Sequence, residues 1–215
     1  QNLLRDHGPQ PLRAFADVYP LLAPRQYDLA TFDLDAALDG ADIVLVHEWN
    51  DPALVASVGA ARARGGAFTL LFHDTHHRAI TAPDEMARYD LRHYDGVLAF
   101  GAVLRDLYLE RGWTQRAWVW HEAADTRLFR PLHLPPEADL AWIGNWGDDE
   151  RSAELHEFLL GPVQALGLRA TVHGVRYPAD AVARLEESGI AYRGWLPNFA
   201  VPRVFAQHRV TVHVP

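Results

Sequence analysis

The chain has 215 residues, of which 49% are apolar and 22% are charged, and its formal net charge is −8. This length and composition are typical of one large or two modest globular domains, and the negative charge argues against nucleic acid or an anionic membrane surface as a partner. Because cysteine is absent, the sequence excludes disulfides, thiolate nucleophiles and cysteine-based zinc sites.

The sequence also lacks signals for membranes and secretion. It has no run of about 18 apolar residues, so it predicts no transmembrane segment. The first ten residues, QNLLRDHGPQ, lack the charged and apolar segments of a secretory signal. We therefore expect a cytoplasmic protein. Nothing in the sequence indicates its oligomeric state.

The first half of the chain alternates short apolar runs with helix-like segments. The run ADIVLVH at 41–47 is almost continuously aliphatic, as expected for a strand that is buried on both faces. Asp51 and Pro52 have the residue types preferred at the N-cap and first position of a helix. In chain order the patterns predict strands at 41–47, 67–72, 96–100 and 116–120, and helices at 53–66, 84–94 and 102–113. Strands separated by helices of this length favour a parallel sheet.

A proline-rich segment then interrupts the alternation. Pro131, Pro135 and Pro136 fall within six residues and predict a stiff connector. After it, the patterns predict strands at 139–144, 169–174, 190–194 and 209–214, and helices at 152–167, 179–189 and 201–208. We therefore predict an α/β protein with two Rossmann-like βα domains. The predicted division is residues 1–130, a linker at 131–138 and residues 139–215; we expect the last domain to be partial, because it stops directly after a strand.

Ligand sites in parallel sheets lie beyond the carboxyl ends of the strands. That rule selects four segments: HEWND at 47–51, HDTHH at 73–77, HEAAD at 121–125 and GNWGDDER at 144–151. Three of them begin with histidine. An imidazole at a strand end often has a structural role, because it hydrogen-bonds backbone groups. Three imidazoles at equivalent ends of one sheet make a functional role about as well supported as a structural one.

The segment HDTHH has two interpretations, a metal site or a polar catalytic loop. A zinc site needs three or four converging ligands, usually with two on one helix face. His73, Asp74, His76 and His77 are predicted on a loop, and no second cluster has matching spacing. We therefore predict no metal site, with His73 directed to the substrate and His76 and His77 facing solvent.

The segment GNWGDDER predicts a strand, a glycine turn and the start of a helix. Gly144 and Gly147 would let the backbone approach a ligand closely, and the N-terminus of the helix offers free N–H groups to phosphate. Asp148 and Asp149 would cap that helix or repel an anion, so Arg151 would have to reach past them. All 20 basic residues are arginine, and this role therefore falls to arginine.

The order of these motifs resembles that in GT-B glycosyltransferases, notably the retaining family called group 1 or family 4. The stretch 42–77, which contains HEWND and ends in FHDTHH, is similar to their acceptor domain. HEAADTRLFRP matches their interdomain junction at Asp125, Phe129 and Pro131. The runs WIGN, TVHGVRYP, AYRGWLP and VTVHVP follow their donor domain in order and spacing, and the GNWGDDER turn is closer to the CgeB-like branch. The resemblance covers about residues 40–215.

The resemblance implies transfer of a sugar from a nucleoside-diphosphate sugar to a hydroxyl of a carbohydrate, lipid or protein acceptor. The transfer would be metal-independent and retaining, with no cofactor beyond the nucleotide sugar. The implied catalytic residues are His73, Asp74 and Glu48, and the implied acceptor-side residues are His47 and Arg78. The implied donor-binding residues are Gly144, Asn145, Trp146, Arg151, Gly174 and Tyr177.

Other functions fit the same patterns. A sugar-nucleotide epimerase or a phosphorylase could use the same fold, since fold does not determine function. A non-catalytic nucleotide-sugar-binding or scaffolding module is a further alternative. A metal-dependent hydrolase built on HDTHH is the last.

Overall fold

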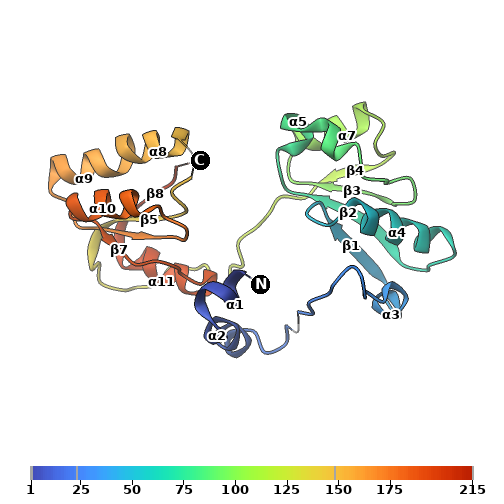
Figure 1. The fold of residues 1–215 in the computed structure, drawn as a ribbon, viewed down its shortest axis with the longest axis horizontal. Helices are drawn as coiled ribbons and strands as arrows, with labels where there is room; N and C mark the ends of the chain where they lie inside the picture. The colour runs from blue at the N-terminus through green and yellow to red at the C-terminus, as the bar shows by residue number, and fades with distance from the viewer. Residues whose placement is uncertain (1, 23, 148, 215) are drawn as a thin grey trace. The chain divides into compact units, whose positions relative to one another are not determined.

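A computed structural model describes residues 2–22, 24–147 and 149–214 (Figure 1). The chain divides into two compact units, each described here by itself. Unit 1 comprises Gln1–Ala23 and Ala124–Pro215, and unit 2 comprises Pro24–Ala123. The domain boundaries predicted from the sequence, 1–130 and 139–215, stay a prediction.

Unit 2 is a parallel α/β unit. Its elements are α3 (Leu34–Leu38), β1 (Ile43–His47), α4 (Pro52–Ala63), β2 (Thr69–Asp74), α5 (Arg78–Thr81), α6 (Pro83–Met86), β3 (Gly96–Ala99), α7 (Ala102–Glu110) and β4 (Ala117–Val119). The sheet has the order β1-β2-β3-β4, and every neighbouring pair is parallel. Helix α4 begins as predicted, because the Asp51 carboxylate accepts the N–H of Ala53 at 2.7 Å and Pro52 occupies the first turn.

The two faces of this sheet differ. One face packs against α4 and α7 in a core that includes Val46, Leu70 and Phe72. Strands that follow one another in a single direction with right-handed crossovers bring their helices to the same face. On the opposite face Ile43 is 65% exposed and Leu45 is 48% exposed. Alternation along each strand therefore decides whether a side chain joins the core or lies on the opposite face.

Unit 1 contains the second parallel sheet. Its elements are α1 (Asn2–His7), α2 (Gln10–Val18), β5 (Ala138–Ile143), α8 (Asp149–Leu155), the π-helix η1 (His156–Leu160), α9 (Gly161–Leu166), β6 (Ala170–His173), α10 (Ala179–Glu187), β7 (Ala191–Tyr192), the 3₁₀-helix η2 (Asn198–Ala200), α11 (Val201–Ala206) and β8 (His208–Val212). The strand order is β7-β6-β5-β8, all parallel. Leu155, Leu159 and Leu185 from the helices pack on Leu140 and Val172 of the sheet.

The structure confirms the predicted fold class, since each unit is a Rossmann-like α/β unit with four parallel strands. The predicted helix at 84–94 is wrong: α6 ends at Met86. Beyond it, the Asp90 side chain accepts the N–H of Arg92 at 3.2 Å, a local bond that competes with helical pairing. Helices α1, α2 and α3 were not predicted.

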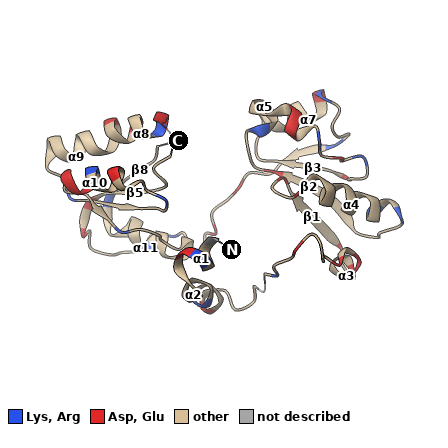
Figure 2. Ribbon diagram, viewed as in Figure 1, with Lys and Arg blue, Asp and Glu red and all other residues tan. Residues whose placement is uncertain are grey.

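Charged residues are sparse in the strands of unit 2, as Figure 2 shows. Of the residues in β1 to β4, all of which the structure describes, only Asp74 is Asp, Glu, Lys or Arg. Asp74 is nevertheless fully buried. A buried carboxyl group needs hydrogen-bond donors from the surrounding protein.

Candidate functional site

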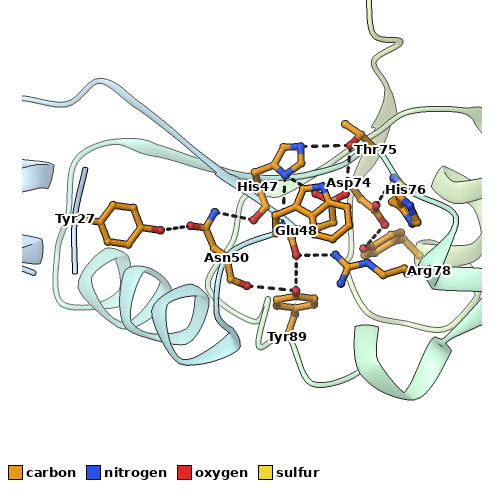
Figure 3. Close-up of polar contacts among 11 residues, drawn as sticks. Tyr27, His47, Glu48, Asn50, Asp74, Thr75, His76, Arg78 and Tyr89 are labelled. Carbon is orange, nitrogen blue, oxygen red and sulfur yellow. Dashed lines mark hydrogen bonds and ion pairs between the residues drawn. The ribbon is translucent and has the colours of Figure 1, made fainter. Parts of the chain in front are cut away.

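The candidate site lies where β1 and β2 end. The two strands run parallel in a register that pairs His47 with His73. The segments that follow them, Glu48–Asn50 and Thr75–Arg78, therefore leave the sheet at the same edge, and Figure 3 shows the polar contacts between them. Tyr89 reaches this edge from the turn after α6, and its hydroxyl donates a short hydrogen bond to the carbonyl of Glu48.

Glu48 is held in a triangle of polar contacts. Its carboxyl group is completely buried, with Oε2 2.5 Å from His47 Nδ1 and Oε1 accepting the Thr75 hydroxyl at 3.2 Å. Thr75 Oγ1 also lies 3.3 Å from His47 Nε2. Glu48 Oε2 has no hydrogen-bond partner among the described residues, and His47 Nδ1 accepts the N–H of Trp49 at 3.4 Å. Both nitrogens of the His47 ring are thereby oriented by neighbours.

Burial governs the protonation of Glu48. Loss of water raises the pKa of its carboxyl above the ordinary value, and the nearby Asp74 charge raises it further, while His47 opposes the shift. The carboxyl group therefore holds its proton to a higher pH than an exposed glutamate would. Since no part of Glu48 is exposed, it acts on a ligand only through the residues that it contacts.

Asp74 has a different set of donors. Its Oδ2 accepts the Tyr108 hydroxyl of α7 at 2.8 Å, and its Oδ1 accepts the N–H of His76 at 3.0 Å. Both Asp74 and Tyr108 are buried in the core of unit 2. The first bond ties β2 to α7 and the second shapes the loop after β2. The catalytic role that the resemblance implies for Asp74 stays a prediction.

His73 lies on the face of the sheet opposite Asp74, because consecutive strand residues point to opposite faces. Its ring centroid is 5.2 Å from that of His47 and 5.0 Å from that of Trp120. Burial lowers the pKa of His73 below its ordinary value, and the neighbouring His47 lowers it further. His73 is therefore a neutral imidazole at neutral pH, set among aromatic rings.

The loop after β2 carries Arg78 to Trp49 and to the end of β1. Arg78 Nη2 donates to the carbonyl of Glu48 at 2.9 Å, and its guanidinium carbon lies 4.3 Å from the Trp49 ring centroid. His77 is exposed, as predicted, but His76 is half-buried, with its ring against Trp49 and 4.1 Å from that of His77. The prediction that His76 faces solvent is therefore wrong, because its ring packs against Trp49.

In unit 1 the predicted donor-binding residues gather at the carboxyl ends of β5 and β6. A Cβ on Gly174 would lie 1.9 Å from the carbonyl oxygen of Gly144, so these two strand ends touch backbone to backbone. Tyr177 closes this contact: its hydroxyl donates to Gly144 O at 2.9 Å and accepts the Trp142 indole N–H at 3.0 Å. Burial raises the pKa of Tyr177 to about 12. Gly174 and Tyr177 thus have a structural reason to be present that needs no ligand.

The residues of the turn after β5 alternate between exposed and buried. Trp146 is 6% exposed and belongs to the core of unit 1. Asn145 is exposed, and its side-chain oxygen accepts the N–H of Val175 at 3.3 Å. A Cβ at Gly147 would lie 2.6 Å from Arg151 Cδ, so the Arg151 side chain covers this turn. Asp149 begins α8, whereas Asp148, the other predicted capping residue, lies outside the described residues. Donor binding by this group stays a prediction.

Several residues of the site in unit 2 were not predicted. They are Trp49, Asn50, Thr75, Tyr89 and Tyr108. Asn50 follows the predicted strand end, and its side-chain amide donates to His47 O at 2.8 Å. Thr75 lies inside the HDTHH segment, so strand-end position could have identified both. Tyr89 and Tyr108 come from positions 41 and 34 residues away from their partners, and no local pattern marks them.

Within the described parts of the chain, no group of three or more His, Cys, Asp and Glu residues is arranged to hold a metal ion. No helix among those parts is both long and apolar enough to cross a membrane. Comparison with known protein families and with curated proteins finds no match for this chain.

Proposed function

We propose that this protein transfers a glycosyl group from a nucleoside-diphosphate sugar to an acceptor hydroxyl. The observation that carries the proposal is the set of oriented imidazoles and buried carboxyls at the carboxyl ends of β1 and β2. Parallel sheets bind ligands at this edge. The motifs that contain these residues are also the ones that resemble GT-B glycosyltransferases, a family with two Rossmann-like domains. The presence of two Rossmann-like units in this chain supports the proposal.

In this proposal the imidazoles contact the substrate. The His47 side chain is 37% exposed and its ring is oriented by Glu48 and Thr75. His73 lies beside it in neutral form, and a neutral imidazole can accept a proton or hydrogen-bond a sugar hydroxyl. Glu48 and Asp74 are positioning residues, since both are completely buried.

The reaction places two demands on the protein. The acceptor oxygen bonds to the anomeric carbon while the bond from that carbon to the diphosphate breaks, and the acceptor proton goes to a base. His47 or His73 is the proposed base. Negative charge accumulates on the departing diphosphate, and the turn at Gly144 with the guanidinium of Arg151 is its proposed binding group in unit 1. We propose that the transfer is metal-independent and retains the anomeric configuration, which requires the acceptor oxygen to approach the face of the sugar from which the diphosphate departs.

The proposal is tested by incubating the protein with a panel of nucleoside-diphosphate sugars and measuring nucleoside-diphosphate release. Release that depends on an added carbohydrate, lipid or peptide acceptor supports a transferase. Sugar interconversion without acceptor identifies an epimerase, and a requirement for free phosphate identifies a phosphorylase. Tight donor binding with no turnover for any acceptor overturns the proposal in favour of a binding module.

Substitutions then test the site. His73→Ala should lower turnover by about tenfold or more and leave the melting temperature close to that of the parent. His77→Ala is the matched control, because the exposed His77 belongs to the same loop. A parallel assay with a chelator tests metal independence. Equal turnover in the parent and His73→Ala proteins would exclude His73 from the chemistry.

A further inference from the structure

Arg78 differs from two other half-buried arginines, Arg62 and Arg105, in its ion pairs. Arg62 and Arg105 each pair with an aspartate, at 3.4 Å and 2.7 Å. No carboxylate of the described residues forms an ion pair with Arg78, and its Nε is buried without a hydrogen-bond partner among them. A half-buried cation without a counter-charge attracts an anion more strongly than an exposed arginine does, because water screens its charge less.

The position of Arg78 is set without a ligand. Its Nη2 donates to the Glu48 carbonyl, which also accepts the Tyr89 hydroxyl (Figure 3). Its guanidinium lies over the Trp49 ring. These contacts hold the planar guanidinium in one orientation. Little side-chain entropy is then lost when an anion binds, and the remaining donors of the guanidinium suit two oxygens of one carboxylate or phosphate group.

The carboxyl groups of the same edge do not compete for Arg78. Glu48 is buried between His47 and Thr75, and Asp74 is buried between Tyr108 and the backbone of His76. In the loop after β2, His77 is exposed, and Thr75, His76 and Arg78 are half-buried. Beside them Trp49 leaves 63% of its surface exposed, and an indole packs well against the C–H face of a pyranose ring.

We propose that Arg78 and Trp49 form a binding site for an anionic sugar, a pyranose that carries a carboxylate or a phosphate. Arg78 binds the anionic group and Trp49 packs against the ring. The inference that this anionic sugar is the acceptor rests on the proposed function. The existence of the binding site can be tested without any transfer reaction.

The test is calorimetric titration of the protein with glucose, glucuronate, glucose 6-phosphate and inorganic phosphate, with no nucleotide sugar present. We expect at least one of the two anionic sugars to bind about tenfold or more tightly than glucose. The glucuronate and glucose 6-phosphate arms distinguish a carboxylate from a phosphate. Inorganic phosphate that binds as tightly as glucose 6-phosphate would overturn the sugar part of the proposal, and equal binding of all three sugars would overturn the whole of it.

Variants locate the site. Arg78→Gln should abolish the preference for the anionic sugar, and Trp49→Ala should weaken binding of the sugar more than that of inorganic phosphate. Arg88→Gln, which removes the same charge from an exposed position nearby, should bind like the parent.

If Arg78→Gln does not fold, Arg78→Lys provides the second variant, and it should weaken binding because an ammonium group offers no planar pair of donors. Unchanged binding by a folded Arg78 variant would contradict the site. Absence of transferase turnover would leave these binding results unaffected.

Discussion

Asp74 and Tyr108 form the buried contact on which the loop after β2 depends. The Asp74 carboxyl is in the core of unit 2, and the Tyr108 hydroxyl donates to it at 2.8 Å. Burial raises the pKa of Tyr108, and the adjacent Asp74 charge raises it further, so this hydroxyl remains a donor. A side chain that keeps a buried carboxyl hydrogen-bonded contributes more than a neutral pair does.

Tyr108→Phe should therefore destabilise the protein by about 1–3 kcal/mol, because Asp74 Oδ2 is left buried without a donor. Tyr94→Phe is the control: Tyr94 is also buried in unit 2, but its hydroxyl donates to a neutral acceptor, the carbonyl of Val55, at 2.9 Å. Its cost should be smaller, about 1 kcal/mol. Urea denaturation of the parent and the two variants measures both values. Equal decreases in the free energy of unfolding would mean that the hydrogen bond from Tyr108 to Asp74 stabilises the protein no more than a hydrogen bond to a neutral acceptor does.

The Glu48 carboxyl makes stability depend on pH. Its pKa in the folded protein is raised above the ordinary glutamate value of 4.5, so the folded state binds this proton more tightly than the unfolded chain does. At pH values below 4.5 the protonated Glu48 therefore makes its full contribution to the free energy of unfolding. This contribution decreases as the pH rises from 4.5 through the raised pKa of the folded state, and above the raised pKa it no longer changes.

Glu48→Gln removes this titration and keeps a group of similar shape between His47 and Thr75. The stability of the variant relative to the parent should rise as the pH increases from about 4 to about 8. The lowered pKa values of His73 and His76 make both proteins less stable as the pH falls below 6.5, and that effect cancels in the difference. Denaturation at a series of pH values measures it. A difference that stays constant across the series would contradict a raised pKa for Glu48.

At the scale of elements, the ends of β5 and β6 are joined more closely than ordinary neighbouring strands. The N–H of Gly144 donates to the carbonyl of His173 at 2.9 Å, and Gly174 leaves no room for a side chain next to Gly144. Tyr177 and Tyr192 then cover the contact, with hydroxyls that donate to the carbonyls of Gly144 and Gly174. The strand ends that precede the predicted donor turn are thereby held rigidly.

Gly174→Ala should force β5 and β6 apart and cost about 1–3 kcal/mol, as overpacking does. Gly59→Ala tests the same change in the middle of α4, where a new Cβ would meet Tyr94 Cε2 at an ordinary contact distance of 3.4 Å. That substitution should stabilise the protein by about 0.5–1 kcal/mol, because alanine loses less entropy than glycine in a helix. Thermal denaturation measures the two opposite shifts. A tolerated Gly174→Ala would show that the strand ends can separate.

At the scale of the whole molecule, the residues that the structure describes form two hydrophobic cores that share no residue. One surrounds Leu70 and Phe72 in unit 2, and the other surrounds Leu155 and Leu185 in unit 1. Each core is assembled on its own parallel sheet. A core that is complete in itself can unfold as a cooperative unit.

Calorimetry should therefore resolve two unfolding transitions. Leu70→Ala should lower the transition temperature of unit 2, and Leu185→Ala should lower that of unit 1. Each substitution should reduce the free energy of unfolding of its unit by about 2–5 kcal/mol, because both leucines are fully buried and their truncation leaves a cavity. Each variant serves as the control for the other. If both substitutions lowered a single shared transition, the two cores would be unfolding together.

The sequence alone determined the α/β class, the succession of strands and the start of α4. These features depend on local periodicity and on capping residues such as Asp51, which act within one or two turns of the chain. The histidines and carboxyls at the ends of β1 and β2 were identifiable for the same reason, since strand ends in a parallel sheet share one edge. The helix expected at 84–94 failed where the local bond of Asp90 overrode the apolar spacing.

Only the tertiary structure decided which of these side chains are buried and what they contact. Glu48 meets the hydroxyl of Thr75 and Asp74 meets that of Tyr108, while Tyr89 binds the carbonyl of Glu48. These partners are 27 to 41 residues apart in the sequence. Burial and pKa depend on the packing of such distant segments, and a local pattern carries no information about which segments will meet. For that reason the complete burial of Glu48 and its bond from Thr75 could not be predicted from the sequence.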